Sequence, residues 1–134
     1  MKSKVRKGKP FIWRWIKKEF PGTDPEKIVI AFGDTIYTEH PISQDLLVHE
    51  HVHLRRQKYS KIYALWWWRK YLTNVKFRAE EEAVAYRTQY QFVKKNVTDR
   101  NALSHAASQM ANMLSSNLYG SILTKSQARK LIEG

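Results

Sequence analysis

The 134-residue sequence lacks cysteine, and it has only 12 Asp and Glu against 24 Lys and Arg. Without cysteine there can be no disulfide framework and no thiolate zinc ribbon, so a transition-metal site must use His, Asp or Glu. No apolar run approaches the roughly 20 residues of a membrane-spanning helix. Residues 11–18 are too few and too charged for the apolar core of a secretion signal. These absences favour a cytoplasmic protein, in the producing or a host cell, without a transmembrane segment.

Apolar residues make up 43% of the chain and aromatic residues 13%, which is enough for a packed core. At this length we expect one domain. Helical spacing predicts a short helix over residues 10–20, ended by Pro21-Gly22. Two β-branched runs, 26–32 and 35–38, flank the turn signal Gly33-Asp34 and predict a hairpin, the only β-structure expected.

The rest of the chain has helical periodicity. Ser43 is placed to cap a helix that continues through Leu54. The aromatic stretch 60–72 predicts a second helix, which we expect to be buried on much of its circumference rather than to serve a membrane or nucleic acid. Further helices are expected over 79–95, beyond Thr98 as far as Tyr119-Gly120, and after a Thr124/Gln127 capping box. The predicted fold class is α+β and mostly helical.

The sequence His49-Glu50-His51-Val52-His53 matches HExxH. His49 and His53 lie four residues apart, so on a helix both imidazoles can reach one metal ion. Glu50, the next residue round the helix, can stand beside a zinc-bound water and accept its proton. This arrangement suits hydrolysis of a peptide bond, and a general base beside the metal favours an enzyme over a purely structural zinc site.

The hairpin, the HExxH helix, the aromatic helix and the later Glu82-Ala83-Val84-Ala85-Tyr86-Arg87 together resemble the minimal gluzincins, especially small phage-encoded metallopeptidases. In that family the third zinc ligand is a glutamate on a later helix. The resemblance spans about residues 26–95. It implies one zincin-like domain with a basic arm and helix (1–25), a catalytic core (26–95) and C-terminal helices (96–134). It also implies a substrate strand along the sheet edge.

Three adjacent glutamates are candidates for the third ligand. With about 100° per residue, Glu82 lies close to the inward stripe that includes Ala79 and Tyr86, Glu80 falls at its edge, and Glu81 points away as a solvated charge. Glu82 and Glu80 both fit the family's Glu-x-x-Ala pattern. We therefore expect zinc to be held by His49, His53 and Glu82, with Glu80 as the alternative.

The other histidines are assigned no chemistry. His51 lies about 200° from either ligand histidine. His40 and His105 are read as ordinary polar residues. The net charge of +12, with eight cations and no acid in residues 1–18, indicates contact with a polyanion or nucleic acid. The alternative function is therefore a basic binding module on a zincin scaffold, with a structural or absent metal.

Overall fold

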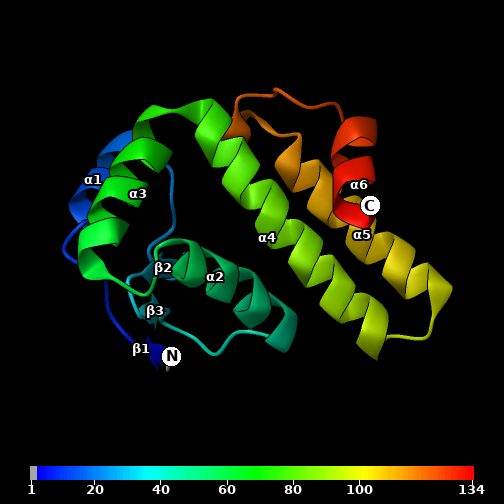
Figure 1. Ribbon diagram of the computed structural model, residues 1–134, viewed down its shortest axis with the longest axis horizontal. Coiled ribbons are helices and arrows are strands. Elements are labelled where there is room, and N and C mark those ends of the chain that lie inside the picture. The colour runs from blue at the N-terminus through cyan, green and yellow to red at the C-terminus, as the bar shows by residue number, and fades with distance from the viewer. Residues whose placement is uncertain (1–2) are drawn as a thin grey trace. The chain divides into compact units, whose positions relative to one another are not determined.

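The computed structural model describes residues 3–134 (Figure 1). The chain forms two compact units, Met1–Thr73 and Asn74–Gly134. Their boundary falls inside the segment 26–95 that the sequence analysis takes as the catalytic core. The mostly helical α+β class is confirmed. We describe each unit by itself.

The first unit contains a three-stranded sheet of order β1-β3-β2. Strands β2 (Ile30–Phe32) and β3 (Thr35–Tyr37) form the predicted antiparallel hairpin, although β2 is shorter than its β-branched run. Gly33 in the two-residue turn has φ +66°, a conformation that favours glycine. Strand β1 (Lys4–Arg6), which was not expected, pairs in parallel with β3.

Three helices complete the first unit: α1 (Trp13–Glu19), α2 (Gln44–Arg56) and α3 (Lys61–Thr73). Helix α2 begins after Ser43 as predicted, although the Ser43 side chain makes no capping hydrogen bond. It packs on β2 and β3. Many of its most deeply buried side chains are aliphatic, among them Ile12, Ile16, Ile30, Ala31, Ile36 and Leu54.

The expectation that α3 is buried on much of its circumference is wrong. One face is buried, through Ala64, Trp67, Trp68, Tyr71 and Leu72. The opposite face exposes Ile62, Tyr63, Leu65 and Trp66. Sequence reasoning missed this because the central run 62–68 has no charged residue to mark its outer side, and the cations of the helix stand only towards its two ends.

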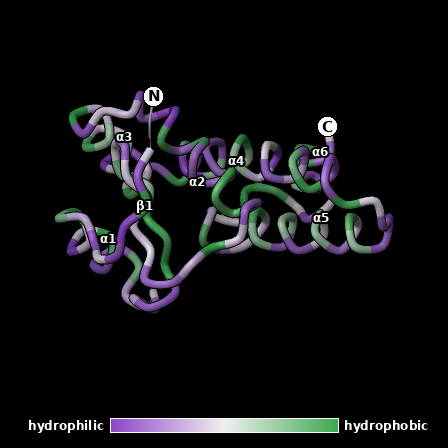
Figure 2. The backbone as a smooth tube through the Cα atoms, turned by 90° about the horizontal axis from the view of Figure 1, so that it is seen from below, coloured by the Kyte–Doolittle hydropathy of each residue, from purple (hydrophilic) through white to green (hydrophobic). Residues whose placement is uncertain are grey.

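The second unit consists of α4 (Val75–Asn96), α5 (Arg100–Leu114), the 3-10 turn η1 (Asn117–Tyr119) and α6 (Lys125–Glu133). Its core joins one face of α4 to α5 and α6. Figure 2 shows the alternation of hydrophobic and hydrophilic residues along α5. The predicted Thr124/Gln127 capping box is present. Tyr119-Gly120 ends η1 and not α5, which stops at Leu114.

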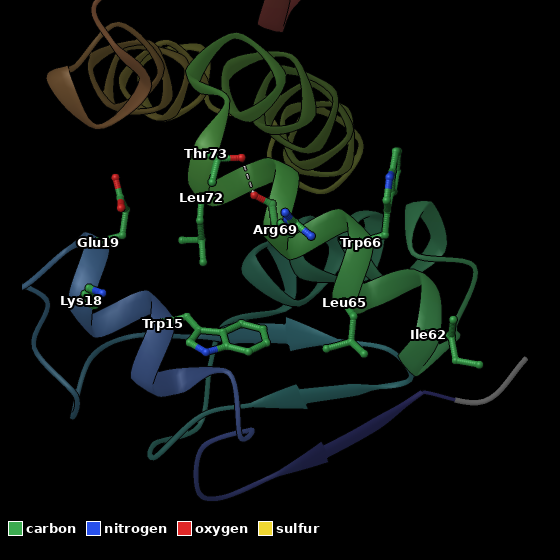
Figure 3. A pocket seen from close by; sticks show the side chains of 9 residues that line it. All are labelled: Trp15, Lys18, Glu19, Ile62, Leu65, Trp66, Arg69, Leu72 and Thr73. Carbon is green, nitrogen blue, oxygen red and sulfur yellow. Dashed lines mark hydrogen bonds between the residues drawn. The ribbon is translucent and has the colours of Figure 1, made fainter.

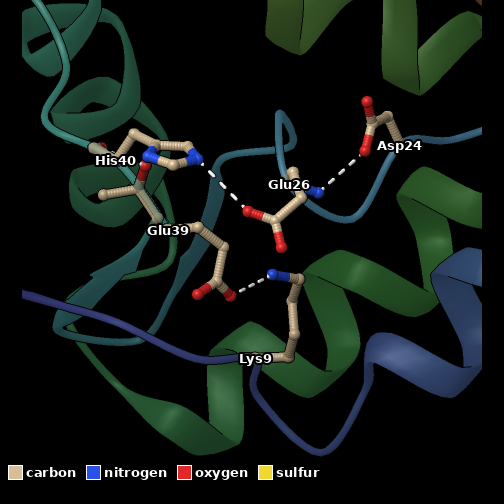
Figure 4. A network of polar contacts seen from close by, with 6 residues as sticks. Lys9, Asp24, Glu26, Glu39 and His40 are labelled. Atoms are coloured by element: carbon tan, nitrogen blue, oxygen red, sulfur yellow. Dashed lines mark hydrogen bonds and ion pairs between the residues drawn. The ribbon is translucent and has the colours of Figure 1, made fainter.

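The N-terminal segment is part of the fold and not a detached arm. Its Lys4–Arg6 stretch is β1, and its residues Ile12 and Ile16 are buried in the core. Lys9 is tied to Glu39, just beyond β3, by a hydrogen bond from its Nζ to Oε2 (Figure 4). Among the described residues no helix is long and apolar enough to cross a membrane.

Candidate metal centre

Helix α2 places His49 and His53 one turn apart on a buried face. Their ring centroids are 5.1 Å apart and the ring planes cross at 80°. Both residues are 4% exposed. Two imidazoles at this spacing present a pair of nitrogen donors to one point in space, as the HExxH spacing predicts.

Glu50 lies beside this pair. Its Oε2 is 4.0 Å from His49 Nε2, and its side chain is 10% exposed. One ligand atom from each of His49, Glu50 and His53 can be chosen so that all three lie within 4.8 Å of one another. In the part of the chain that the structure describes, this is the group of His, Asp and Glu close enough to hold a metal ion.

Aromatic rings from α3 form a wall beside the centre. Trp67 lies against His53, with ring centroids 5.2 Å apart. Tyr71 stacks on Trp67 at 5.0 Å with an interplanar angle of 22°. Such a wall fixes the imidazole plane and lowers the local dielectric, which strengthens charge interactions at the centre. From the sequence, these rings are expected only to pack in the core.

Gln57, at the end of α2, is fully buried and holds this helix against the hairpin. Its Oε1 accepts from Gly33 N at 2.7 Å, and its Nε2 donates to Ala31 O at 3.0 Å. Trp68 Nε1 donates to the same carbonyl at 2.9 Å. The hairpin is thus bonded to both α2 and α3. Sequence reasoning missed Gln57, although its position four residues after His53 places it on the histidine face.

The chain reverses directly after Gln57. Lys58 and Tyr59 have φ of +57° and +53°, a left-handed conformation that is uncommon for non-glycine residues. Tyr59 N donates to Leu54 O at 3.0 Å and closes the turn. This short connection brings α3 back beside α2, so that Trp67 meets His53.

The remaining histidines lie apart from the centre. His51 faces Tyr59, with ring centroids 5.7 Å apart, and burial lowers its pKa, with a further lowering by Arg55. His40 Nε2 lies 3.2 Å from Glu26 Oε2 at the surface (Figure 4). His105 is exposed on α5.

The expected orientation of the glutamates on α4 is wrong for one residue. Glu81, predicted to be a solvated charge, is 4% exposed, Glu82 is 6% exposed, and Glu80 is exposed. Helix α4 has two buried faces side by side, and sequence reasoning assumed one. The apolar face packs on α5 and α6, and the polar face contains Arg78, Glu81, Glu82 and Gln89. The assignment of Glu82 as third ligand stays a prediction.

The imidazole nitrogens of His49 and His53 are donors that zinc accepts, and Glu50 beside them can act as a base, so the residues present fit a zinc ion. A third protein ligand would leave one position open for water or substrate. Comparison with protein-family models, with curated proteins and with solved structures finds no match to this chain. The assignment of function therefore depends on the geometry and chemistry of the residues.

Proposed function

We propose that this protein is a zinc-dependent metallopeptidase of the gluzincin type. The observation that carries the proposal is the buried group on α2, in which donor atoms of His49, Glu50 and His53 lie within 4.8 Å of one another. Two imidazoles with a carboxylate close beside them bring together the kinds of donor atom that zinc accepts, which favours a metal site. The order of residues in the HExxH motif assigns the two histidines as metal ligands and the glutamate as the general base.

His49 and His53 would hold the ion through their ring nitrogens, and both must be neutral to do so. A bound zinc ion supplies a Lewis acid that polarises a carbonyl and lowers the pKa of water. Glu50 accepts a proton from the attacking water and later returns it to the amine that leaves. Trp67 keeps the His53 ring in one orientation, and the aromatic wall limits the access of bulk water.

The bonds at the β2 edge limit where a substrate strand can pair. Both acceptor directions of Ala31 O are used, by Gln57 Nε2 and by Trp68 Nε1. A carbonyl oxygen has two lone pairs, so this group has no capacity left for a substrate N–H. A peptide laid along β2 would have to bond other backbone groups of the strand.

The decisive experiment combines metal analysis of the purified protein with a broad peptide-cleavage screen, with and without chelator. We expect zinc near one equivalent per chain and cleavage that chelation abolishes. Glu50→Gln should keep zinc and fold but lower the cleavage rate by about a hundredfold or more, the scale of a lost general base. Normal cleavage by this variant would overturn the assignment of Glu50.

A second function is favoured by the charge of +12. On this reading the chain is a basic module that binds nucleic acid or another polyanion, and its metal is structural or absent. Association with a polyanion should then be independent of chelator and of Glu50. Binding without any cleavage in the screen would favour this second function over the first.

A further inference from the structure

A groove runs between α1 and α3 on the first unit (Figure 3). Its cavity volume is about 770 Å³, and its apolar side chains are Trp15 from α1 with Ile62, Leu65, Trp66 and Leu72 from α3. In Figure 3, Trp15 extends beneath α3 while Leu65 and Leu72 point towards it. Ile62 is 81% exposed and Trp66 is 56% exposed. The groove and its rim thus expose several large apolar side chains, and exposed apolar surface of this kind marks an interaction site.

Positive charge outweighs negative charge on the two helices that form the groove. Helices α1 and α3 together hold six cations and one acid, Glu19. Two of these cations, Lys18 and Arg69, line the groove itself, together with Glu19. The six cations are Arg14, Lys17, Lys18, Lys61, Arg69 and Lys70. An occupant must therefore be apolar on one side and acidic on its flanks.

The shape of the groove distinguishes between possible occupants. A bilayer surface receives side chains that protrude, whereas Trp15, Leu65 and Leu72 face one another across a cavity that a flat surface would leave unfilled. A second copy of this chain would bring another +12 charge against the cationic walls. Helix α3 has 13 residues and so extends about 20 Å. That length matches about three to four turns of a partner helix.

We propose that the α1–α3 groove binds an acidic amphipathic helix of a partner protein. The helix would place apolar side chains at every third or fourth position into the groove, in the helix-in-groove mode of recognition. Its acidic flanks would meet Lys18 and Arg69 and the cations beside them. This inference stands independently of the metal centre, which is on α2 and contacts α3 through Trp67 on the buried face of that helix.

Fluorescence anisotropy of a labelled model helix tests the proposal. The probe has Leu at three- and four-residue spacing and Glu at most other positions, and its control is a scrambled peptide of the same composition. Leu65→Glu, which places a carboxylate in the groove, should raise the Kd of the amphipathic helix at least about tenfold. Tyr63→Glu is the control, because it also introduces a carboxylate on α3 but outside the groove, and it should raise the Kd far less.

Nuclear magnetic resonance of the indole N–H groups locates the probe. The Trp15 and Trp66 signals should shift on binding, whereas Trp68, whose indole bonds Ala31 O, should not. Equal binding of the scrambled peptide, or an equal effect of the two variants, would show that binding depends only on overall charge. Either result would overturn the proposal. So would absence of peptide binding, or groove-dependent binding to phosphatidylglycerol vesicles without binding to the helix.

Discussion

Two adjacent carboxylates on α4 are buried, and each is a candidate for the third zinc ligand. Glu81 and Glu82 are 4% and 6% exposed, while their neighbour Glu80 is exposed. Ionised groups are seldom buried unless paired or bound to a cation. The sequence pattern favours Glu82 over Glu80 as the third zinc ligand. Because Glu81 is buried and Glu80 is exposed, Glu81 is a stronger alternative to Glu82 than Glu80 is.

Zinc titration of Glu80→Gln, Glu81→Gln and Glu82→Gln separates these residues. We expect Glu82→Gln to weaken zinc binding by well over tenfold, because loss of a ligand costs more than the 10-fold to 100-fold typical of an outer-shell partner. Glu80→Gln is the matched surface control and should leave zinc affinity unchanged. A loss confined to Glu81→Gln would move the ligand by one residue. Retention of zinc by all three variants would refute a ligand from this run.

The Lys9–Glu39 ion pair should make stability depend on pH. The hydrogen bond from Lys9 lowers the pKa of Glu39 below its usual 4.5. The folded state therefore favours the carboxylate, and the pair stabilises the fold above about pH 4.5. This contribution is lost as the pH falls through the lowered pKa. In urea unfolding, the stability difference between the native chain and Glu39→Gln should shrink on acidification.

The matched control for this measurement is Glu19→Gln, which removes an exposed carboxylate at the end of α1. It should change the pH profile less than Glu39→Gln does. A stability difference between the native chain and Glu39→Gln that stays constant from neutral pH to below pH 4 would show that the ion pair contributes nothing.

At the level of elements, the attachment of α2 to the hairpin determines whether the histidine pair has a fixed support. Gln57 is 0% exposed and bonds both Gly33 N and Ala31 O. Replacement by alanine leaves the buried Gly33 N–H without its acceptor, whereas Ala31 O keeps the bond from Trp68. The main cost is therefore one unsatisfied donor, together with the cavity that the truncation leaves.

We expect Gln57→Ala to lower the free energy of unfolding by about 2 kcal/mol or more, the scale of one buried unsatisfied group with some loss of packing. Its exposed neighbour offers a control, Lys58→Ala, which should cost much less. Both can be measured by urea denaturation. Equal stabilities of Gln57→Ala and the native chain would show that the hairpin does not depend on this side chain.

Local sequence signals were sufficient to predict the helices and the hairpin whose periodicity, turns and caps lie within a few residues of one another. Helical periodicity located α2 and α3 to within a residue or two, the Gly33-Asp34 turn located the hairpin, and Thr124 with Gln127 located the start of α6. The HExxH spacing brought His49, Glu50 and His53 together.

The features that sequence reasoning missed depend on distant partners. Strand β1 consists of three exposed residues, and it forms only by pairing with β3, some 30 positions later in the chain. Gln57 acts through hydrogen bonds to the hairpin, and these partners cannot be inferred from a polar residue at the end of a helix. The polar buried face of α4 has no hydrophobic periodicity, so a search for apolar stripes cannot find Glu81.

For the whole molecule, the net charge of +12 indicates association with a polyanion, and the fold determines how this can be tested. Removal of residues 1–18 would also delete β1 and the buried Ile12 and Ile16, so the deletion cannot be expected to spare the metal centre. Neutralisation of exposed cations is the sounder experiment. Lys9 must be kept because it pairs with Glu39.

The triple variant Lys4→Gln, Arg6→Gln and Lys7→Gln removes three exposed charges near β1. If this segment contacts a polyanion, the slope of log K against log salt for heparin or DNA should fall by up to about 2 to 3, since each phosphate contact contributes about 0.7 to 0.9. The control, with Gln at Lys94, Lys125 and Lys130, has the same net charge of +9 (12 − 3) but loses its cations from the second unit. A specific role for the N-terminal segment requires the first variant to lose more affinity than the control. Equal losses would mean that total charge alone attracts the polyanion, and a native affinity that does not change with salt would show that no such electrostatic contact exists.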